Sequence, residues 1–472
     1  MIRQLIVVRA ADFPFLVKPR GRKPESPHEL FSQISAKLHE LLPGFRKRLG
    51  ILGVPSLDWE PYLTQDLPTG TELPPPERHV IALNIQDLAS LEEFRQAVED
   101  ANNSASAAPP FPGVGADLSL AESEYFCPTG VDQLLFGDRA AAAALTQSQV
   151  LKTQGLTGQG VNIVVIDEGF DANMVRNFGG GLISSPLTGT TVQPGATVRG
   201  HGMMMVRNIL DAAPDATFYD VPLIPLRISN VTGFIGDALG AFTELWLLIG
   251  FLRQLGIPPW DGPWILVNAW SIFDRSTEYP HGDYTENPHH PLNVVVDDIV
   301  GDGTDIVFAA GNCGQFCPDR RCGKRDVGPG TSIFGANSHP RVLTTGAVRT
   351  DALWIGSSSE GPGQPSLSRH KPDLCAPSYF REVDDASLGN LSEPFVGDTG
   401  TPYIASTGTS AACALTAGIV AAIRSKWDPW TVSPDKLKYI LNRQARKTEG
   451  PNWNERLGHG IIDVNATLSA LP

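Results

Sequence analysis

The chain has 472 residues, of which 51 are acidic and 37 basic, so its formal net charge is −14 at pH 7. A hydrophobic fraction of 42% with 19% charged residues is ordinary for a globular protein and too apolar for a disordered chain. The negative charge argues against nucleic acid or an anionic membrane surface as the main partner.

The first hundred residues have the pattern of a small α+β domain. Apolar spacing predicts a helix over residues 26–41, and the sequence RHVIALNI over residues 78–85 is typical of a strand. Residues 1–50 carry ten Lys or Arg against four Asp or Glu, a charge of +6, which leaves −20 on the remainder. We therefore predict an N-terminal domain over residues 1–110 and a linker over residues 111–146.

Neither a secretory signal nor a membrane span is predicted. The apolar stretch near the N-terminus, residues 5–8, has four residues, whereas a secretory signal needs about 7–15. The most apolar internal run, residues 245–252, has eight, whereas a span needs about 20, so it predicts a buried helix. We therefore expect a cytoplasmic protein with no membrane partner.

From residue 147 onward, apolar strands alternate with helical stretches. This alternation predicts an α/β fold over residues 147–472, in which a parallel sheet is flanked by helices on both faces. In such sheets, functional residues gather at the carboxyl ends of the strands. The predicted strands are residues 161–166, 216–224, 264–267, 305–310 and 341–348, and the predicted helices are residues 201–211, 234–255, 292–300, 410–426 and 433–444.

Four polar residues stand at these strand ends and helix starts. Asp167 ends one predicted strand and Asn312 follows another, whereas His201 and Ser410 open predicted helices. Asp, His and Ser are the parts of a nucleophilic triad, and an amide can donate a hydrogen bond to a developing oxyanion. Each residue alone has a structural interpretation, as a helix cap or a turn residue. The four together indicate catalysis.

The sequence blocks around these residues resemble those of the subtilisin-like serine peptidases, the subtilase superfamily. In the family's order, the chain has GLTGQGVNIVVIDEG ending at Gly169, then HG at His201 followed by AAPDA, FAAGN ending at Asn312, and GTSAA around Ser410. The resemblance covers about 320 of the 472 residues. Further matching segments are GAV at residues 346–348, KPDLCAP at residues 371–377 and GHGIIDVNA at residues 458–466.

The resemblance implies a serine endopeptidase that cleaves protein or peptide substrates through an acyl-enzyme. Ser410 would be the nucleophile, His201 the general base and then acid, and Asp167 the residue that orients His201. Asn312 and the Ser410 N–H would form the oxyanion hole. No cofactor is required, and the sequence identifies no metal ligands, although structural calcium is frequent in the family. The implied substrate-binding residues are Asn268, Trp270, Ser271, Ala310 and Gly311.

The sequence departs from the family's pattern close to these residues. Glu168 stands where the family has Thr or Ser, and Arg207 stands where a Gly allows close packing. Trp270 and Phe273 occupy a usually small substrate strand. A catalytically silent, subtilase-shaped binding protein therefore stays open as an alternative. Residues 1–110 take the place of a family propeptide, so we expect them to restrain activity, and we also expect a regulatory protein partner.

Three of the six cysteines lie close together, with the spacing C-x3-C-x4-C over Cys313, Cys317 and Cys322. Zinc sites usually show C-x2-C pairs or a nearby His. We therefore favour reduced thiols here, and leave a loop disulfide and a metal site open. The other three, expected to be small buried residues, are Cys127, Cys375 and Cys413.

Other common sites on parallel sheets do not fit. The glycines at 155, 158 and 160 precede the first strand of the sheet, whereas a dinucleotide fingerprint follows it. The chain has no G-x-x-x-x-G-K-[ST] motif for phosphate binding, and no G-x-S-x-G elbow surrounds Ser410.

Overall fold

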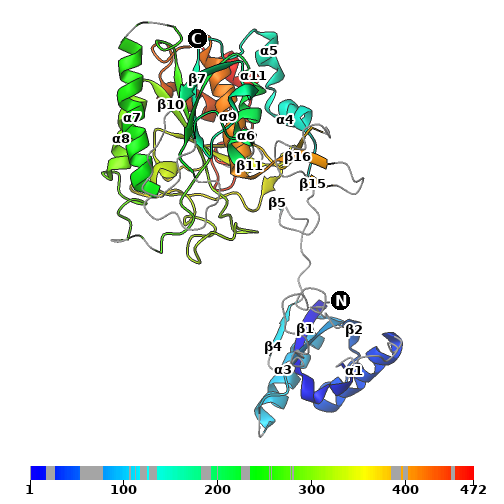
Figure 1. Cartoon of the computed structure of the whole chain (residues 1–472). Helices are drawn as coiled ribbons and strands as arrows, with labels where there is room; N and C mark the ends of the chain where they lie inside the picture. The colour runs from blue at the N-terminus through cyan, green and yellow to red at the C-terminus, as the bar shows by residue number, and fades with distance from the viewer. Residues whose placement is uncertain are drawn as a thin grey trace, which may run out of the picture. The chain divides into compact units, whose positions relative to one another are not determined.

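The chain forms two compact units, Met1–Ser123 and Glu124–Pro472, and each is described by itself (Figure 1). The computed structural model describes residues 2–16, 27–53, 78–105, 108–111, 113–116, 125–126, 135–181, 193–198, 200–224, 234–254, 256, 258–276, 278, 281–383, 395–396, 402–447 and 452–472.

The first unit is a four-stranded antiparallel sheet with two helices. Its strand order is β2-β3-β1-β4, the split β-α-β arrangement. Ile34, Leu38 and Phe94 on the helices and Ile6 and Ile81 on the strands are fully buried in its core. The small α+β unit expected from the sequence is therefore confirmed. Its elements are β1 (Ile2–Arg9), α1 (Pro27–Leu41), β2 (Gly50–Gly53), β3 (Arg78–Ile85), α3 (Leu88–Ser104), β4 (Gly113–Ala116) and the 3-10 turns Ala10–Asp12 and Pro14–Leu16.

The segment expected to be a linker, residues 111–146, holds regular structure at both ends. Strand β4 pairs with β1, with Gly115 opposite Leu5. Helix α4 (Arg139–Thr146) belongs to the second unit and begins where the Asp138 carboxylate accepts a hydrogen bond from the Ala141 N–H. Residues 112, 117–124 and 127–134 of this segment lie outside the described residues.

The second unit is built on a nine-stranded, mostly parallel sheet. The strand order is β5-β12-β11-β10-β9-β6-β8-β7, and β13 also pairs with β11. The strands are β5 (Tyr125–Phe126), β6 (Asn162–Asp167), β7 (Asn177–Gly181), β8 (Thr217–Pro222), β9 (Trp264–Asn268), β10 (Thr304–Ala309), β11 (Leu343–Val348), β12 (Trp354–Ile355) and β13 (Leu374–Pro377). A separate small sheet contains β14 (Phe380–Val383), β15 (Phe395–Val396) and β16 (Pro402–Ser406).

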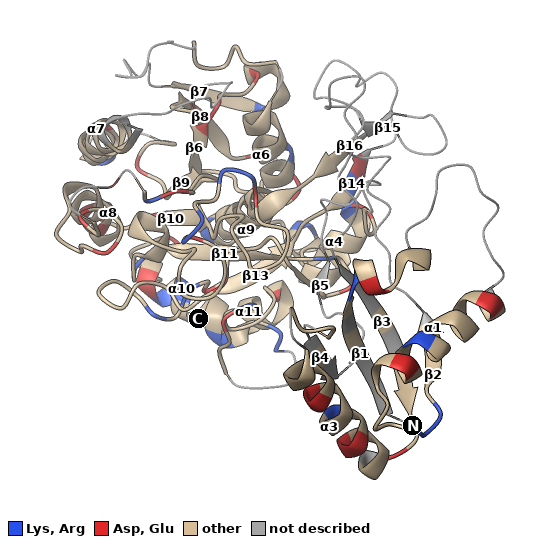
Figure 2. Ribbon diagram, turned by 90° about the horizontal axis from the view of Figure 1, so that it is seen from below, with Lys and Arg blue, Asp and Glu red and all other residues tan. Residues whose placement is uncertain are grey.

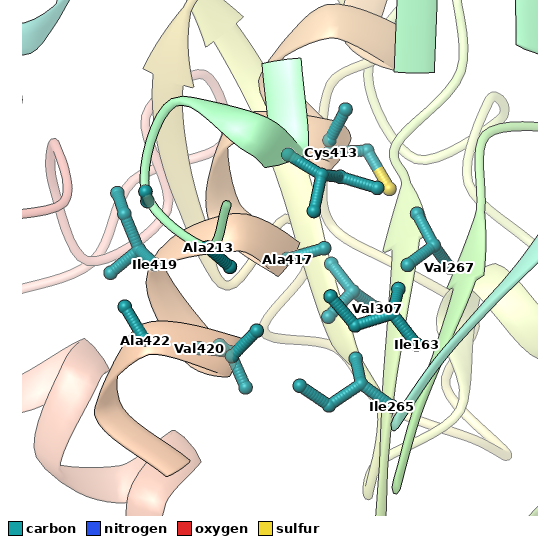
Figure 3. Close-up of a cluster of buried hydrophobic side chains, with 14 of the residues drawn as sticks. Ile163, Ala213, Ile265, Val267, Val307, Cys413, Ala417, Ile419, Val420 and Ala422 are labelled. Carbon is teal, nitrogen blue, oxygen red and sulfur yellow. The ribbon is translucent and has the colours of Figure 1, made fainter. Parts of the chain in front are cut away.

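Helices cover both faces of the large sheet, as predicted (Figure 2). Successive side chains of a strand point to opposite faces, so Val164 and Ile166 of β6 pack with α7 and α8, whereas Ile163 and Val165 pack with α6 and α9. Figure 3 shows the second of these cores, with small α9 residues such as Ala417 against the strands. The helices are α5 (Gln149–Thr153), α6 (His201–Leu210), α7 (Phe234–Gln254), α8 (Pro291–Gly301), α9 (Gly408–Arg424), α10 (Pro434–Gln444) and α11 (Val464–Ala470), with 3-10 turns at Ala172–Met174 and Gly335–Ser338.

The apolar run at residues 245–252 is helical but only partly buried. Leu245 and Ile249 of α7 are buried, whereas Leu247 is 63% and Phe251 58% exposed. The prediction of a wholly buried helix was therefore wrong, because α7 lies outermost and only one side of it meets the sheet. Among the helices in the described ranges, none is both long and apolar enough to cross a lipid bilayer.

Candidate active site

Asp167 and His201 form a hydrogen-bonded pair at the carboxyl end of the sheet. Asp167 is the last residue of β6, with a side chain 1% exposed, and His201 is the first residue of α6. His201 Nδ1 lies 2.8 Å from Oδ1 and 2.9 Å from Oδ2 of Asp167. Burial alone lowers the pKa of His201, but the charge and hydrogen bond of Asp167, together with the charge of Glu168, raise it above its usual value. The pair therefore favours a protonated imidazole.

Two glycines let α6 begin this close to the end of β6. A Cβ on Gly202 would lie 2.2 Å from the carbonyl oxygen of Gly169, so the backbones meet where no side chain fits. Gly169 has φ +95°, in the left-handed region that favours glycine. The glycines of the Asp and His sequence blocks are thus explained by the contact between the two blocks.

Ser410 lies in the first turn of α9 and is 5% exposed. Its Oγ donates to the carbonyl oxygen of Ala269, 3.2 Å away. Ser410 and His201 both belong to the described residues, and no hydrogen bond joins their side chains. Helices α6 and α9 nevertheless begin side by side. Met204 lies in the first turn of α6 and Thr407 directly before α9, and the Sδ of Met204 accepts a hydrogen bond from the Thr407 N–H at 3.3 Å.

The rest of the α6–α9 contact fixes their direction. Further along both helices, a Cβ on Gly418 would lie 2.7 Å from the carbonyl oxygen of Ile209. The helices therefore run parallel from the same end, which places the start of α9 beside the start of α6. In the first turn of α9, the Thr409 N–H donates to Asn312 and the Ala411 N–H to the Thr407 carbonyl oxygen, so the Ser410 N–H is the candidate donor to an anion.

Asn312 follows β10 and is held by Thr409. Its Oδ1 accepts from the backbone N–H of Thr409 at 2.9 Å and from the Thr409 hydroxyl at 3.0 Å. The same hydroxyl accepts from the Gly311 N–H at 3.1 Å. These bonds fix the orientation of the amide, and a Cβ on Gly408 would lie 3.2 Å from its Nδ2. The sequence did not single out Thr409, although it is adjacent to Ser410.

The five predicted substrate-binding residues divide into two sets. Ser271 and Gly311 come together, since a Cβ on Gly311 would lie 3.0 Å from Ser271 Oγ. Ala310 and Asn268 are fully buried, and Asn268 Oδ1 accepts from Trp270 Nε1 at 3.1 Å. Trp270 is 6% exposed and its side chain lies in the core, and substrate binding by these five residues stays a prediction.

Phe308 and Asn337 hold Trp270 in the core. Its ring meets Phe308 edge-on with centroids 5.2 Å apart, and its carbonyl oxygen accepts from Asn337 Nδ2 at 2.9 Å. Arg207, the other bulky departure, pairs with the buried Glu382 of β14. The fold therefore accommodates both departures, Trp270 through Phe308 and Arg207 through Glu382.

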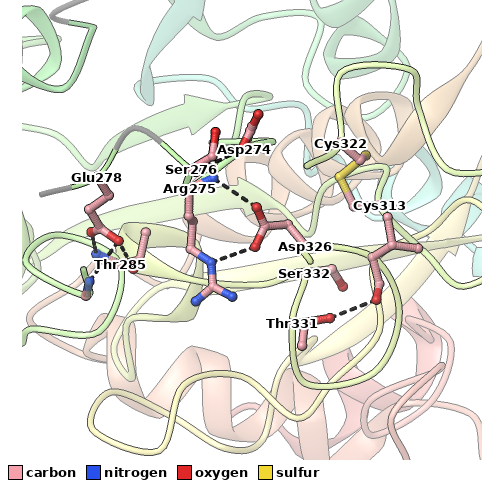
Figure 4. A network of polar contacts seen from close by, with 12 residues as sticks. Asp274, Arg275, Ser276, Glu278, Thr285, Cys313, Cys322, Asp326, Thr331 and Ser332 are labelled. Atoms are coloured by element: carbon pink, nitrogen blue, oxygen red, sulfur yellow. Dashed lines mark hydrogen bonds and ion pairs between the residues drawn. A yellow bond between two sulfur atoms is a disulfide. The ribbon is translucent and has the colours of Figure 1, made fainter. Parts of the chain in front are cut away.

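A disulfide joins Cys313 and Cys322 directly after Asn312 (Figure 4). The preference for reduced thiols was therefore wrong for these two, and Cys317 is disulfide-bonded as well. The Asp319 N–H donates to the Asn312 carbonyl oxygen at 2.8 Å, so the closed loop is tied to the site. Cys375 and Cys413 are free and buried, as expected, and burial raises the pKa of both thiols. Cys127 lies outside the described residues.

Arg321 on this loop brings a positive charge towards the Asp167–His201 pair. Its guanidinium lies 4.1 Å from the ring centroid of Phe273 and pairs with Asp319 at 2.9 Å. Like burial, its charge acts to lower the pKa of His201, whereas the charge and hydrogen bond of Asp167 and the charge of Glu168 raise it. Within the described part of the chain, no group of three or more His, Cys, Asp or Glu is arranged to hold a metal ion.

The comparisons with known proteins agree with the sequence blocks. Residues 256–460 match the model of the Subtilase family. Subtilisin E of Bacillus subtilis (strain 168) is 25% identical over 292 residues, which cover 60% of this chain and 61% of subtilisin E. The chain thus spans less than two thirds of that relative. Subtilisin of Bacillus pumilus is 25% identical over 327 residues, 68% of this chain and 95% of that relative.

The chain is also similar to solved structures. One is a crystal structure of MycP1 with the N-terminal propeptide removed, whose sequence is 21% identical to this chain. The match covers 70% of this chain and 96% of the MycP1 chain, with a TM-score of 0.47. MycP1 from Mycobacterium smegmatis is 20% identical with the same TM-score and covers 72% of this chain and 87% of its own. The predicted resemblance to the subtilisin-like serine peptidases is confirmed.

Proposed function

We propose that the chain is a serine endopeptidase that cleaves proteins or peptides through an acyl-enzyme. The observation that carries the proposal is the Asp167–His201 pair at the start of α6, beside the start of α9, which carries Ser410. The Subtilase match over residues 256–460 supports it, since this stretch contains Asn312 and Ser410.

In the proposed first step, the Ser410 hydroxyl turns from the Ala269 carbonyl oxygen towards His201 Nε2. Ser410 Oγ attacks the substrate carbonyl carbon, and His201 takes its proton. Asp167 accepts the hydrogen bond from Nδ1–H and stabilises the imidazolium. The negative oxygen of the tetrahedral intermediate receives hydrogen bonds from the Ser410 N–H and from Asn312 Nδ2. His201 then gives the proton to the leaving amine, and water repeats the sequence on the acyl-enzyme.

The test is turnover of a casein or peptide-library substrate by the purified full chain. We expect Ser410→Ala and His201→Ala each to lose nearly all turnover, because residues that act as a unit fail together. Asn312→Ala should lose about 10²–10³ in kcat, the effect of removing one oxyanion donor from a subtilisin. Ser469→Ala, on the surface of α11, is the matched control. Unchanged proteolysis in Ser410→Ala would end the proposal.

A catalytically silent binding protein is the second candidate. It is favoured by the hydrogen bond of Ser410 to Ala269, which keeps the hydroxyl away from His201. In an active enzyme, by contrast, the hydrogen bond between Ser410 and His201 would form when substrate binds, since catalytic hydrogen bonds are often long or misaligned without it. Binding of a peptide with equal affinity to wild type and Ser410→Ala, without cleavage by either, would favour the silent protein.

We propose further that the first unit restrains activity, as a propeptide-like or regulatory domain. The unit precedes the second one in the chain, which is the place of a propeptide in the family that the sequence blocks resemble. We expect residues 124–472, refolded alone, to be more active than the full chain, and residues 1–123 added in trans to inhibit them. A truncated protein that is folded and no more active would contradict this restraint.

The cytoplasmic location and the absence of a required cofactor stay predictions, as does a regulatory partner. The Cys313–Cys322 disulfide bears on the location, since disulfides persist mainly in oxidising compartments. Cell fractionation with an antibody to the chain is the direct measurement.

A further inference from the structure

Glu168 contacts both members of the Asp167–His201 pair. Its backbone N–H donates to Asp167 Oδ1 at 2.8 Å. Its side-chain Oε2 accepts from the backbone N–H of His201, also at 2.8 Å. Glu168 therefore fixes the Asp167 carboxylate through its backbone and the start of α6 through its side chain.

The start of α6 needs this contact. The residue before the helix is Gly200, which has φ +120° and no side chain to cap the first N–H groups. The Glu168 carboxylate supplies the acceptor from a different segment, and a negative charge at a helix N-terminus is stabilised by the helix dipole. The Thr or Ser that the family has at this position carries no charge there.

Glu168 also places a second negative charge beside the imidazole. Burial raises the pKa of the half-buried Glu168, as does the charge of Asp167, whereas the His201 N–H lowers it. The charged groups that face His201 are Asp167 at the end of β6, Glu168 directly after it and Arg321 on the disulfide loop. Burial raises the pKa of Asp220 on β8, and the charge of Asp167 raises it further.

We propose that Glu168 is a positioning residue that holds Asp167 and His201 in register and supplies a second negative charge to the imidazolium formed during catalysis. The proposal rests on the proposed peptidase function, because the imidazolium forms in that reaction. It explains why a half-buried carboxylate stands at this position, since the side chain accepts the hydrogen bond of the His201 N–H.

The first readout needs no turnover. Carbon-labelled histidine is introduced into the full chain with Ser410→Ala, and the His201 signal, one of ten, is assigned from its loss in His201→Ala. We expect Glu168→Gln to lower the pKa of His201 and Arg321→Gln to raise it, because these charges act in opposite directions. Arg320→Gln, the exposed neighbour on the same loop, is the control and should leave the pKa unchanged. An unchanged titration in Glu168→Gln would overturn the proposal.

The second readout is kinetic. Glu168→Ala removes the acceptor at the start of α6, so we expect kcat to fall by about tenfold to a hundredfold with little change in KM, as for a small misplacement of a catalytic group. Glu168→Gln keeps an acceptor oxygen and should recover most of kcat, with the acid limb of its pH profile moved to lower pH. Equal kcat in wild type and a folded Glu168→Ala would overturn the proposal.

The two readouts separate this proposal from the peptidase proposal. If wild type cleaves no peptide but Glu168→Gln still moves the His201 titration, the peptidase function fails while the role of Glu168 in setting His201 stands. If wild type cleaves peptides and neither the titration nor kcat responds to Glu168, only the Glu168 proposal fails.

Discussion

Removing the Cys313–Cys322 disulfide should cost both stability and activity. The bridge joins residues nine positions apart and so closes a loop of about ten residues. In the chain-entropy account, such a loop stabilises the folded state by about 2.7 kcal/mol. Other bonds also hold the loop, including Gly323 N–H to the Phe273 carbonyl oxygen at 2.8 Å. We therefore expect Cys313→Ala/Cys322→Ala to fold, with a free energy of unfolding lower by about 2–3 kcal/mol.

The same variant should lose turnover, because the loop begins at Asn312 and is tied to its carbonyl oxygen through Asp319. Unfolding in urea is followed by tryptophan fluorescence. Eight of the nine tryptophans belong to the second unit, which contains the disulfide, and only Trp59 belongs to the first, so the signal reports mainly on the second unit. Cys375→Ala removes a free buried cysteine and is the matched control. An equal loss of stability in both variants, or full turnover in the double variant, would refute the reasoning.

Three further changes test the site and its surroundings. Gly202→Ala places a Cβ 2.2 Å from the Gly169 carbonyl oxygen and should lower both Tm and turnover, whereas Gly240→Ala, with open space at its Cβ, should leave both unchanged or raise Tm slightly. Burial raises the pKa of Asp220 to about 6, so ionisation of this carboxyl opposes folding as pH rises from about 4 through 6. The difference in Tm between Asp220→Asn and wild type should therefore be more favourable to the variant at pH 7.5 than at pH 4.5. The raised pKa of His201 should put the acid limb of kcat/KM above pH 6.5, and a limb below pH 6 would contradict it.

Much of the fold and the location of the candidate site could be predicted from local patterns. Apolar runs bounded by Gly and polar residues identify buried parallel strands, and Asp167 and Asn312 mark the ends of two of them. The starts of α6 and α9 were predictable to within two residues, because Gly200 comes directly before His201 and Gly408 comes two residues before Ser410. These features depend on residues close together in the sequence.

What could not be predicted depends on distant partners. Arg207 is accommodated by Glu382, 175 residues later in the chain. The spacing of three cysteines does not determine which two approach each other, so the Cys313–Cys322 pairing needed the loop geometry. The burial of the Trp270 side chain against Phe308 depends on which face of the sheet it meets.

The account's central claim is that Ser410 is an activated nucleophile. Labelling of the native full chain with a fluorophosphonate, followed by mass analysis of the digested protein, tests it most directly. We predict one label, located on Ser410, that is lost in Ser410→Ala and strongly reduced in His201→Ala but retained in Ser469→Ala. A native chain that takes no label, or takes it equally in Ser410→Ala, would contradict the account.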